Sequence, residues 1–235
     1  MSGPCADCRH PRCCCVVSAG RVLSLSWRRT SRSTRGASSE TSGRTRFDSS
    51  QGQATARNSR AMPDLNAAER ARSIGAANVV RRDAAGGWFG DMCDGEGYVA
   101  GLRKEGCDLQ GKRALLVGAG GAGSAIAHAL VDAGVASLAL HEADVPRREA
   151  LAAKLRAYGA VVPTVGSTDA SAFDLVINAT PMGMKEGDPL PVNAATLQAG
   201  TFVGCVVTKP AVPPLIEQAR ARGLPTMTGA GMFAA

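Results

Sequence analysis

The chain has 235 residues and a formal net charge of +7, with 45% hydrophobic and only 4% aromatic residues. Residues 1–60 hold eleven arginines against three acidic residues, a balance of +8, which leaves about −1 on the remaining residues. The basic charge therefore belongs to the N-terminal segment and gives no support for a nucleic-acid-binding domain. No apolar run reaches the roughly 18 residues that a membrane span needs.

Residues 1–61 are rich in Arg, Ser and Cys and carry no lasting helical or strand period, which predicts a disordered tail. An Arg/Ser-rich, acid-poor start is also typical of an organelle transit peptide. A mis-set start codon or a frame-shifted segment ahead of Met62 explains the composition equally well.

The cysteines divide between this tail and the rest of the chain. Cys5 and Cys8 with His10 could form half of a zinc site, but no second pair follows at the required spacing, so we expect no metal. Cys93, Cys107 and Cys205 lie far apart, which indicates a reducing, cytoplasmic compartment.

Residues 62–105 predict the remnant of a small α/β domain and a linking helix. A short helix is expected from Asp64 to Ser73, with Gly75 as its stop signal. The runs 78–82 and 88–91 predict a hairpin around the turn 84–87. Asp94 is a suitable N-cap for a helix over 95–104.

Residues 106–235 predict a dinucleotide-binding domain, and the stretch 114–133 carries this prediction. An apolar run at 114–117, a glycine-rich turn at 118–123 and a helical pattern at 124–133 give the strand–loop–helix context that a G-x-G-x-x-G motif requires. Gly118 permits the tight turn, Gly120 lets a diphosphate approach the backbone, and Gly123 lets the helix pack on its strand. A glycine-rich buried turn without a ligand is the alternative.

The pattern then repeats to the end of the chain. Further strands are expected at 137–141, 160–165, 173–178, 201–207 and 225–228, and helices from Asp144 to about Tyr158, at 213–222 and from Gly231 onward. Strands that alternate with helices predict an α/β fold of Rossmann type, with a doubly wound parallel sheet.

Glu142 ends the second strand, 19 residues after Gly123. An acidic residue there accepts hydrogen bonds from the ribose hydroxyls of the adenosine, which favours NAD. Arg147 and Arg148 follow and could instead hold the 2′-phosphate of NADP, although a solvated helix face explains them as well.

Four stretches resemble the family of shikimate dehydrogenases and their quinate-oxidising relatives, over roughly residues 62–235. The stretches are Gly75-Ala-Ala-Asn78-Val-Val, Gly90-Asp-Met-Cys-Asp94-Gly-Glu-Gly97, the glycine loop, and Asn178-Ala-Thr-Pro-Met-Gly-Met184. The segment Val203 to Leu215, with Pro210 and Pro214, is similar to a fifth family motif.

The resemblance implies a role for each matching residue. Asp94 would be the catalytic carboxylate beside the reacting hydroxyl, and Asn78 would bind substrate hydroxyls. The dinucleotide would contact a set of residues on five loops: Gly118, Ala119, Gly120, Gly121, Ala122, Gly123, Glu142, Asn178, Ala179, Thr180, Pro181, Met182, Val206 and Gly229. Hydride leaves a ring carbon while a proton leaves its hydroxyl, so an acid/base group must lie beside that oxygen. For Asp94, a simple N-cap is the alternative.

The chain departs from the family pattern in several places. The family's catalytic lysine precedes the aspartate, but the first lysine here is Lys104. Met92-Cys93 stands where Asn-Thr is usual, and Thr208 where a tyrosine is usual. The segment 229–235 fits a family motif up to the chain end, so we expect a truncated last helix.

The predicted function is NAD(P)-dependent hydride transfer between shikimate and 3-dehydroshikimate in aromatic amino acid biosynthesis, impaired by the lost lysine. An inert dinucleotide-binding fragment and a quinate dehydrogenase are the alternatives. The expected partner is a small ring hydroxy acid, with no nucleic acid and no membrane. The sequence does not determine the oligomeric state.

Overall fold

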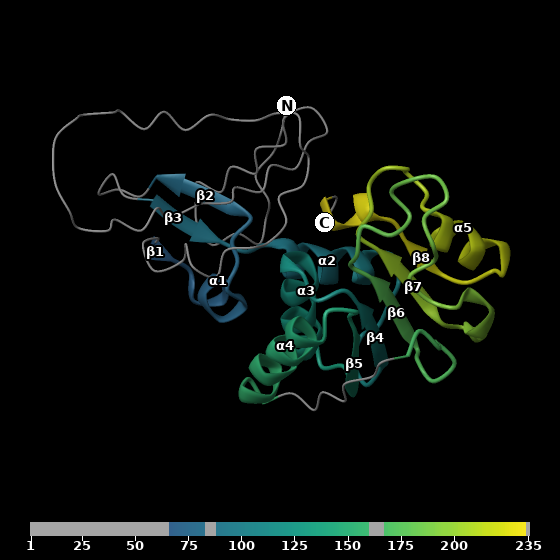
Figure 1. Cartoon of the computed structure of the whole chain (residues 1–235), viewed down its shortest axis with the longest axis horizontal. Coiled ribbons are helices and arrows are strands. Elements are labelled where there is room, and N and C mark those ends of the chain that lie inside the picture. The colour runs from purple at the N-terminus through teal and green to yellow at the C-terminus, as the bar shows by residue number, and fades with distance from the viewer. Residues whose placement is uncertain (1–65, 83–87, 160–166, 234–235) are drawn as a thin grey trace, which may run out of the picture.

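The computed structural model describes residues 66–82, 88–159 and 167–233. These residues form a small sheet with one short helix and a larger sheet with helices on both faces (Figure 1). The predicted tail, the hairpin turn 84–87 and the predicted strand 160–165 lie outside the described residues. Among the described residues, no helix has the length and apolar character needed to cross a membrane.

The small sheet has three strands in the order β1-β3-β2, with β1 at Asn66–Ala67, β2 at Val79–Arg82 and β3 at Trp88–Asp91. The antiparallel pairing of β2 with β3 confirms the predicted hairpin strands. The helix predicted from Asp64 is wrong at its start: α1 spans Glu69–Ile74, because Asn66 and Ala67 pair in parallel with β3. Gly75 ends α1 in the left-handed conformation, as expected.

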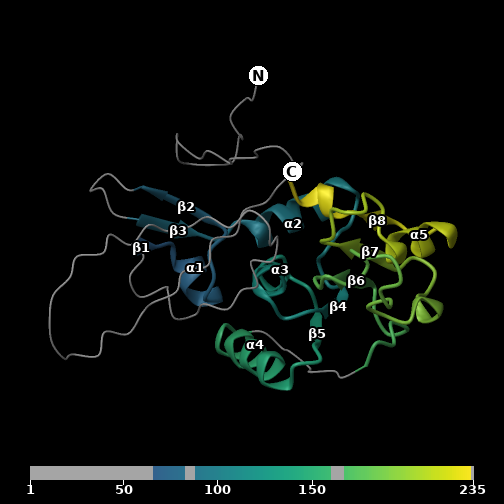
Figure 2. The ribbon, with the colours of Figure 1, turned by 45° about the horizontal axis from the view of Figure 1, so that its top comes forward.

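Helix α2, Asp94–Lys104, connects this sheet to the larger one (Figure 2). The predicted N-cap is wrong by one residue: Cys93 is the N-cap and makes no side-chain capping bond. Asp94 is therefore the first helical residue, and its carboxylate accepts a hydrogen bond from Asn78 instead.

The larger sheet has five parallel strands in the order β5-β4-β6-β7-β8. Strands β4 (Arg113–Val117) and β5 (Ser137–His141) match the prediction closely, and β6 (Leu175–Asn178), β7 (Phe202–Cys205) and β8 (Thr226–Met227) are shorter than predicted. This order confirms the predicted Rossmann-like α/β fold.

The helices cover both faces of this sheet. Helices α2, α3 (Gly121–Asp132) and α4 (Val145–Ala157) pack on one face, around buried residues such as Leu116, Ile126 and Leu155. Helix α5 (Pro214–Ala221) and the 3₁₀ turn η2 (Ala194–Thr196) cover the other face. Helix α3 begins three residues earlier than predicted, inside the glycine loop, and the segment after Gly229 is a 3₁₀ helix, η3 (Gly229–Phe233).

The strands end in register at one edge of the sheet. Val117 lies beside His141 on β5 and beside Asn178 on β6, and Asn178 lies beside Cys205 on β7. Strands β5 and β6 lie on opposite sides of β4, so the strand order reverses at β4. In open α/β sheets, ligands bind outside the carboxyl ends of the strands at such a reversal.

Candidate functional site

The glycine loop between β4 and α3 lies at this reversal. Gly118 has φ +104°, and a Cβ there would lie 2.8 Å from the carbonyl oxygen of Ala179. A Cβ on Gly123 would collide with the Gly118 carbonyl. Both positions therefore require glycine to fold, whereas a Cβ on Gly120, the N-cap of α3, would meet nothing within 4 Å.

The start of α3 suits an anion. Gly120 has no side chain to cap the helix, and none of the first-turn residues is acidic. Gly120, Gly121 and Ala122 are partly exposed, whereas Ala119 is buried. A helix of 12 residues with uncapped N–H groups carries a partial positive charge at this end, which favours a phosphate.

Glu142 lies directly beside the loop. Its Oε2 accepts a hydrogen bond from the backbone N–H of Ala119 at 3.0 Å, and its Oε1 accepts one from Asp144 at 3.0 Å. Burial by itself raises the pKa of Glu142, but these two bonds and the nearby Arg147 outweigh that effect and lower the pKa below its ordinary value. The carboxylate is thus ionised at neutral pH and held against the glycine loop.

The turn after β6 contacts the same loop from the other side. Asn178 is only 1% exposed, and its Oδ1 accepts hydrogen bonds from the backbone N–H and the hydroxyl of Thr180. Its Nδ2 donates to the Met182 carbonyl and lies 3.3 Å from the Cys205 sulfur. Asn178 therefore shapes the turn from beneath, whereas Pro181 and Met182 are exposed on it.

Val206 and Gly229 complete the predicted set at this edge. The backbone N–H of Val206 donates to the Asn178 carbonyl at 2.9 Å. A Cβ on Gly229 would lie 2.5 Å from the Val206 carbonyl oxygen, so η3 approaches the end of β7 closely. The fourteen predicted cofactor residues thus converge on the carboxyl edge of one sheet.

The two residues predicted to contact substrate pair with each other. Asn78 precedes β2 and donates from Nδ2 to the Asp94 carboxylate, while its Oδ1 accepts the backbone N–H of Cys93 at 2.9 Å. Burial raises the pKa of the Asp94 carboxyl above its ordinary value, and the Asn78 hydrogen bond offsets only part of this effect. A carboxyl with a raised pKa beside an amide is suited to proton exchange with a hydroxyl.

Helix α2 brings this pair close to the carboxyl ends of the sheet strands. Gly95 packs against the carbonyl of Ala125, one turn into α3, so closely that a Cβ would collide there. Gly97 likewise packs against the Met232 carbonyl of η3. Two glycines in the first turn of α2 therefore allow Asp94 to lie beside the start of α3.

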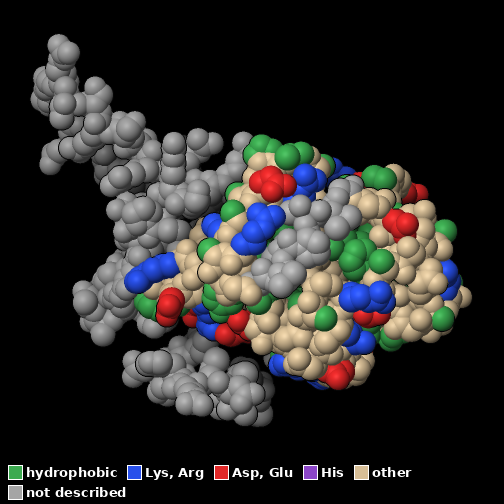
Figure 3. All heavy atoms as spheres, turned by 90° about the horizontal axis from the view of Figure 1, so that it is seen from below, with side chains coloured by type: hydrophobic (Ala, Val, Ile, Leu, Met, Phe, Trp, Pro, Cys, Tyr) green, Lys and Arg blue, Asp and Glu red, His purple; other side chains and the backbone are tan. Residues whose placement is uncertain are grey.

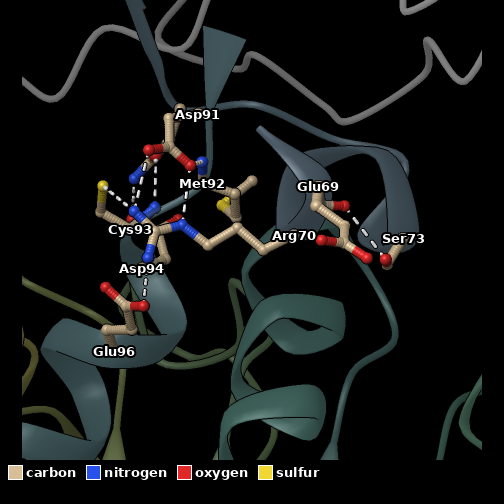
Figure 4. A network of polar contacts seen from close by, with 9 residues as sticks. Glu69, Arg70, Ser73, Asp91, Met92, Cys93, Asp94 and Glu96 are labelled. Atoms are coloured by element: carbon tan, nitrogen blue, oxygen red, sulfur yellow. Dashed lines mark hydrogen bonds and ion pairs between the residues drawn. The ribbon is translucent and has the colours of Figure 1, made fainter. Parts of the chain in front are cut away.

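The ion pairs around Asp94 were not predicted from the sequence. Arg70 on α1 binds Asp91 through two parallel hydrogen bonds and also contacts Glu96 (Figure 4). Lys154 on α4 was also not predicted; its Nζ donates to the Ile74 carbonyl at the end of α1 at 2.9 Å. Neither has a local sequence signal, because the partners are 21 and 80 residues apart.

Nothing in the described part of the chain suggests another site. No group of three or more His, Cys, Asp or Glu side chains there could hold a metal ion, and Cys93, Cys107 and Cys205 form no disulfide there. An open depression beside α5 is lined by Ala194, Ala195, Gln218 and Arg222, none of which belongs to the predicted site. On the face shown in Figure 3, basic and acidic side chains are interspersed and form no extended basic surface.

Several known proteins are similar to this chain in sequence and fold. No family model matches the chain. The NADP⁺-dependent shikimate dehydrogenase of Rhodospirillum rubrum is 36% identical over 172 residues, which cover 70% of this chain and 61% of that enzyme. The chain thus spans about 60% of the length of the curated relatives it matches.

Two solved structures extend the likeness to the fold. Quinate dehydrogenase from Corynebacterium glutamicum, in complex with NAD, is 36% identical with a TM-score of 0.66, covering 73% of this chain and 64% of that one. The 5-ketofructose reductase of a Gluconobacter strain, in its ligand-free form, is 32% identical with the same TM-score and the same coverage.

Proposed function

We propose that the chain is a member of the shikimate/quinate dehydrogenase family and that it binds a nicotinamide dinucleotide and a ring hydroxy acid for hydride transfer. The observation that carries this proposal is the convergence of the glycine loop, Glu142 and the Asn178–Met182 turn on one sheet edge, with Asp94 adjacent to Gly95, which packs against Ala125 of α3. Two of the three relatives named above are dehydrogenases of shikimate and of quinate.

The residues of the sheet edge fit the cofactor. The open space at Gly120 and the uncapped N-terminus of α3 suit the diphosphate, since a Cβ at Gly120 would occupy the approach to these N–H groups. The Glu142 carboxylate is an acceptor for ribose hydroxyls. The exposed Met182 on its turn would line the nicotinamide side.

We propose NAD rather than NADP, with NADP as the alternative. Two carboxylates, Glu142 and Asp144, lie at the predicted ribose position, and one cation, Arg147, contacts both. Arg148 is paired with Glu149. The local charge is therefore negative, and a 2′-phosphate would meet net repulsion unless Arg147 left its carboxylate partners.

In the proposed reaction, Asn78 and Asp94 hold the hydroxyl that is oxidised. The nicotinamide supplies the hydride acceptor when it is bound. Asn78 would orient a hydroxyl oxygen, and Asp94 would hold or accept its proton, for which a raised pKa is favourable. With shikimate this oxidation of one ring hydroxyl gives 3-dehydroshikimate, and the reverse reduction is the step that family members supply to aromatic amino acid biosynthesis.

Turnover by this chain is expected to be weak. No lysine precedes Lys104 in the 235 residues, and Lys104 ends α2, ten residues after Asp94, which corresponds to about 15 Å along a helix. The family pairs its catalytic aspartate with a lysine, and loss of a proton-transfer residue typically costs ~10²–10⁴-fold in rate. A dinucleotide-binding protein without turnover is therefore the second candidate function.

Two measurements on the full chain distinguish the candidates. Titration with NADH and with NADPH, followed by fluorescence, tests cofactor binding and the preference for NAD. Absorbance at the NAD(P)H band with shikimate or quinate tests turnover. Binding with slow turnover supports the dehydrogenase, binding without turnover selects the inert protein, and no binding of either dinucleotide refutes both.

A further inference from the structure

Arg70 binds two acidic side chains that lie on either side of Asp94 in the sequence. Its Nε and Nη2 donate to the two carboxylate oxygens of Asp91 at 2.7 and 2.8 Å, three residues before Asp94. Its Nη1 pairs with Glu96, two residues after Asp94. Figure 4 shows the guanidinium between these acidic side chains. The distance from Nη2 to the Cys93 sulfur is 3.8 Å.

These ion pairs act on the turn between β3 and α2. Cys93 occupies the N-cap of α2 without a capping side-chain bond. The Asp91 carboxylate instead accepts the backbone N–H of Met92 at 2.8 Å, so fixing Asp91 also fixes the next peptide. Arg70 and Asn78, which lie outside this turn, therefore both contribute to its geometry.

Asn78 connects the turn at Asp91–Cys93 to the Asp94 carboxylate. Its backbone N–H donates to the Asp91 carbonyl at 2.9 Å, and its side chain binds both the Cys93 N–H and the Asp94 carboxylate. A shift of Asp91 would move the backbone on which Asn78 is hydrogen-bonded. The contacts thus run without a gap from Arg70 through Asp91 and Asn78 to Asp94.

The main effect of the ion pair between Arg70 and Asp91 is to fix the orientation of the two side chains. The Arg70 side chain is 39% exposed and that of Asp91 22% exposed, and ion pairs with such access to water contribute little to folding. Two parallel N–H···O bonds, however, fix the relative geometry of guanidinium and carboxylate in a way that a lysine cannot reproduce. The charge of Arg70 is thus less important here than its planar shape.

We propose that Arg70 is a positioning residue: by clamping Asp91 and Glu96 it sets the turn from which Asp94 meets Asn78, and hence the substrate hydroxyl. The proposal rests on the proposed function only in naming Asp94 as the carboxyl that meets the substrate. It predicts that the Asn78–Asp94 hydrogen bond weakens when the two-point clamp is lost, even where a positive charge is kept.

The test uses the side-chain amide protons of Asn78 in the full chain, observed by ¹⁵N NMR and assigned by their loss in Asn78→Asp. In Arg70→Gln and Arg70→Lys, we expect these protons to shift and to exchange with water about 3- to 10-fold faster than in wild type, as for the loss of one hydrogen bond. Arg113→Gln is the matched control, because Arg113 makes the same two-point contact with Asp174 at the opposite edge of the sheet.

The outcomes separate clearly. Faster exchange in both Arg70 variants, with Arg113→Gln as wild type, supports the clamp. Wild-type exchange in folded Arg70→Lys overturns it, because charge alone would then suffice, and Arg70→Lys decides the question if Arg70→Gln does not fold. Equal effects of Arg113→Gln also overturn it, since the change would then reflect general loosening. The affinity of the wild type for NADH is measured separately. If the proposed function is wrong, NADH does not bind, and the NMR comparison still tests the role of Arg70.

Discussion

Replacing Gly120 by alanine separates cofactor binding from folding. Gly120 has φ −75° and ψ −167°, an extended conformation that alanine adopts, and its Cβ would meet no atom within 4 Å. Alanine is poorer than glycine at an N-cap but restricts the unfolded chain, and these effects of about 0.5–1 kcal/mol oppose each other. We therefore expect the unfolding free energy of Gly120→Ala to stay within about 1 kcal/mol of wild type.

The effect on binding is expected to be much larger. The added methyl group would lie where a diphosphate approaches the N–H groups of α3, and overpacking of a tight contact costs about 1–3 kcal/mol. This corresponds to an increase of about 5- to 150-fold in the Kd for NADH. Fluorescence titration of the full chain measures the Kd, and urea unfolding measures the stability.

Gly123→Ala is the matched variant. Its Cβ would collide with the Gly118 carbonyl, which is backbone and cannot move aside easily, so this variant should lose both stability and NADH binding. If Gly120→Ala is folded and binds NADH like wild type, the diphosphate does not lie on this loop, and the reasoning that places the cofactor there is wrong.

Three further predictions concern stability. Burial raises the pKa of Asp94, so the folded state favours the protonated carboxyl. The contribution of Asp94 to stability is therefore complete below the ordinary pKa of 3.8 and is lost as the pH rises through the raised pKa. Asp94→Asn should unfold at higher urea than wild type at pH 7 but not below pH 3.8. The Tyr98 hydroxyl is buried without a hydrogen-bond partner among the described residues, so Tyr98→Phe should add about 1 kcal/mol to the unfolding free energy, and a lower value would point to a hidden partner. Lys154→Met removes the donor to the end of α1 and should cost about 0.5–1 kcal/mol in urea unfolding; no change would mean that this contact does not hold α1.

The sequence predicted the dinucleotide half of the fold well because its signals are local. The strand at 137–141 and the helix opened by Asp144 depend on an apolar run, a cap and a proline within a few residues, and both are observed within one residue. The helix predicted from Asp64 fails for the opposite reason. Residues 66–67 are drawn into a strand by pairing with β3, more than twenty residues away, and helical propensity is a weak preference beside such pairing.

The wrong N-cap prediction at the start of α2 changes the chemistry expected of Asp94. A capping aspartate would commit its carboxylate to backbone N–H groups, and such hydrogen bonds lower a carboxyl pKa. With Cys93 at the cap, the Asp94 carboxylate instead meets one side-chain amide in a buried setting, and its pKa is raised. No local rule distinguishes these two outcomes, because the choice between them depends on a contact with Asn78, which lies just before β2. Burial of this carboxyl, which the Asn78 hydrogen bond offsets only in part, raises its pKa and would suit Asp94 to proton transfer.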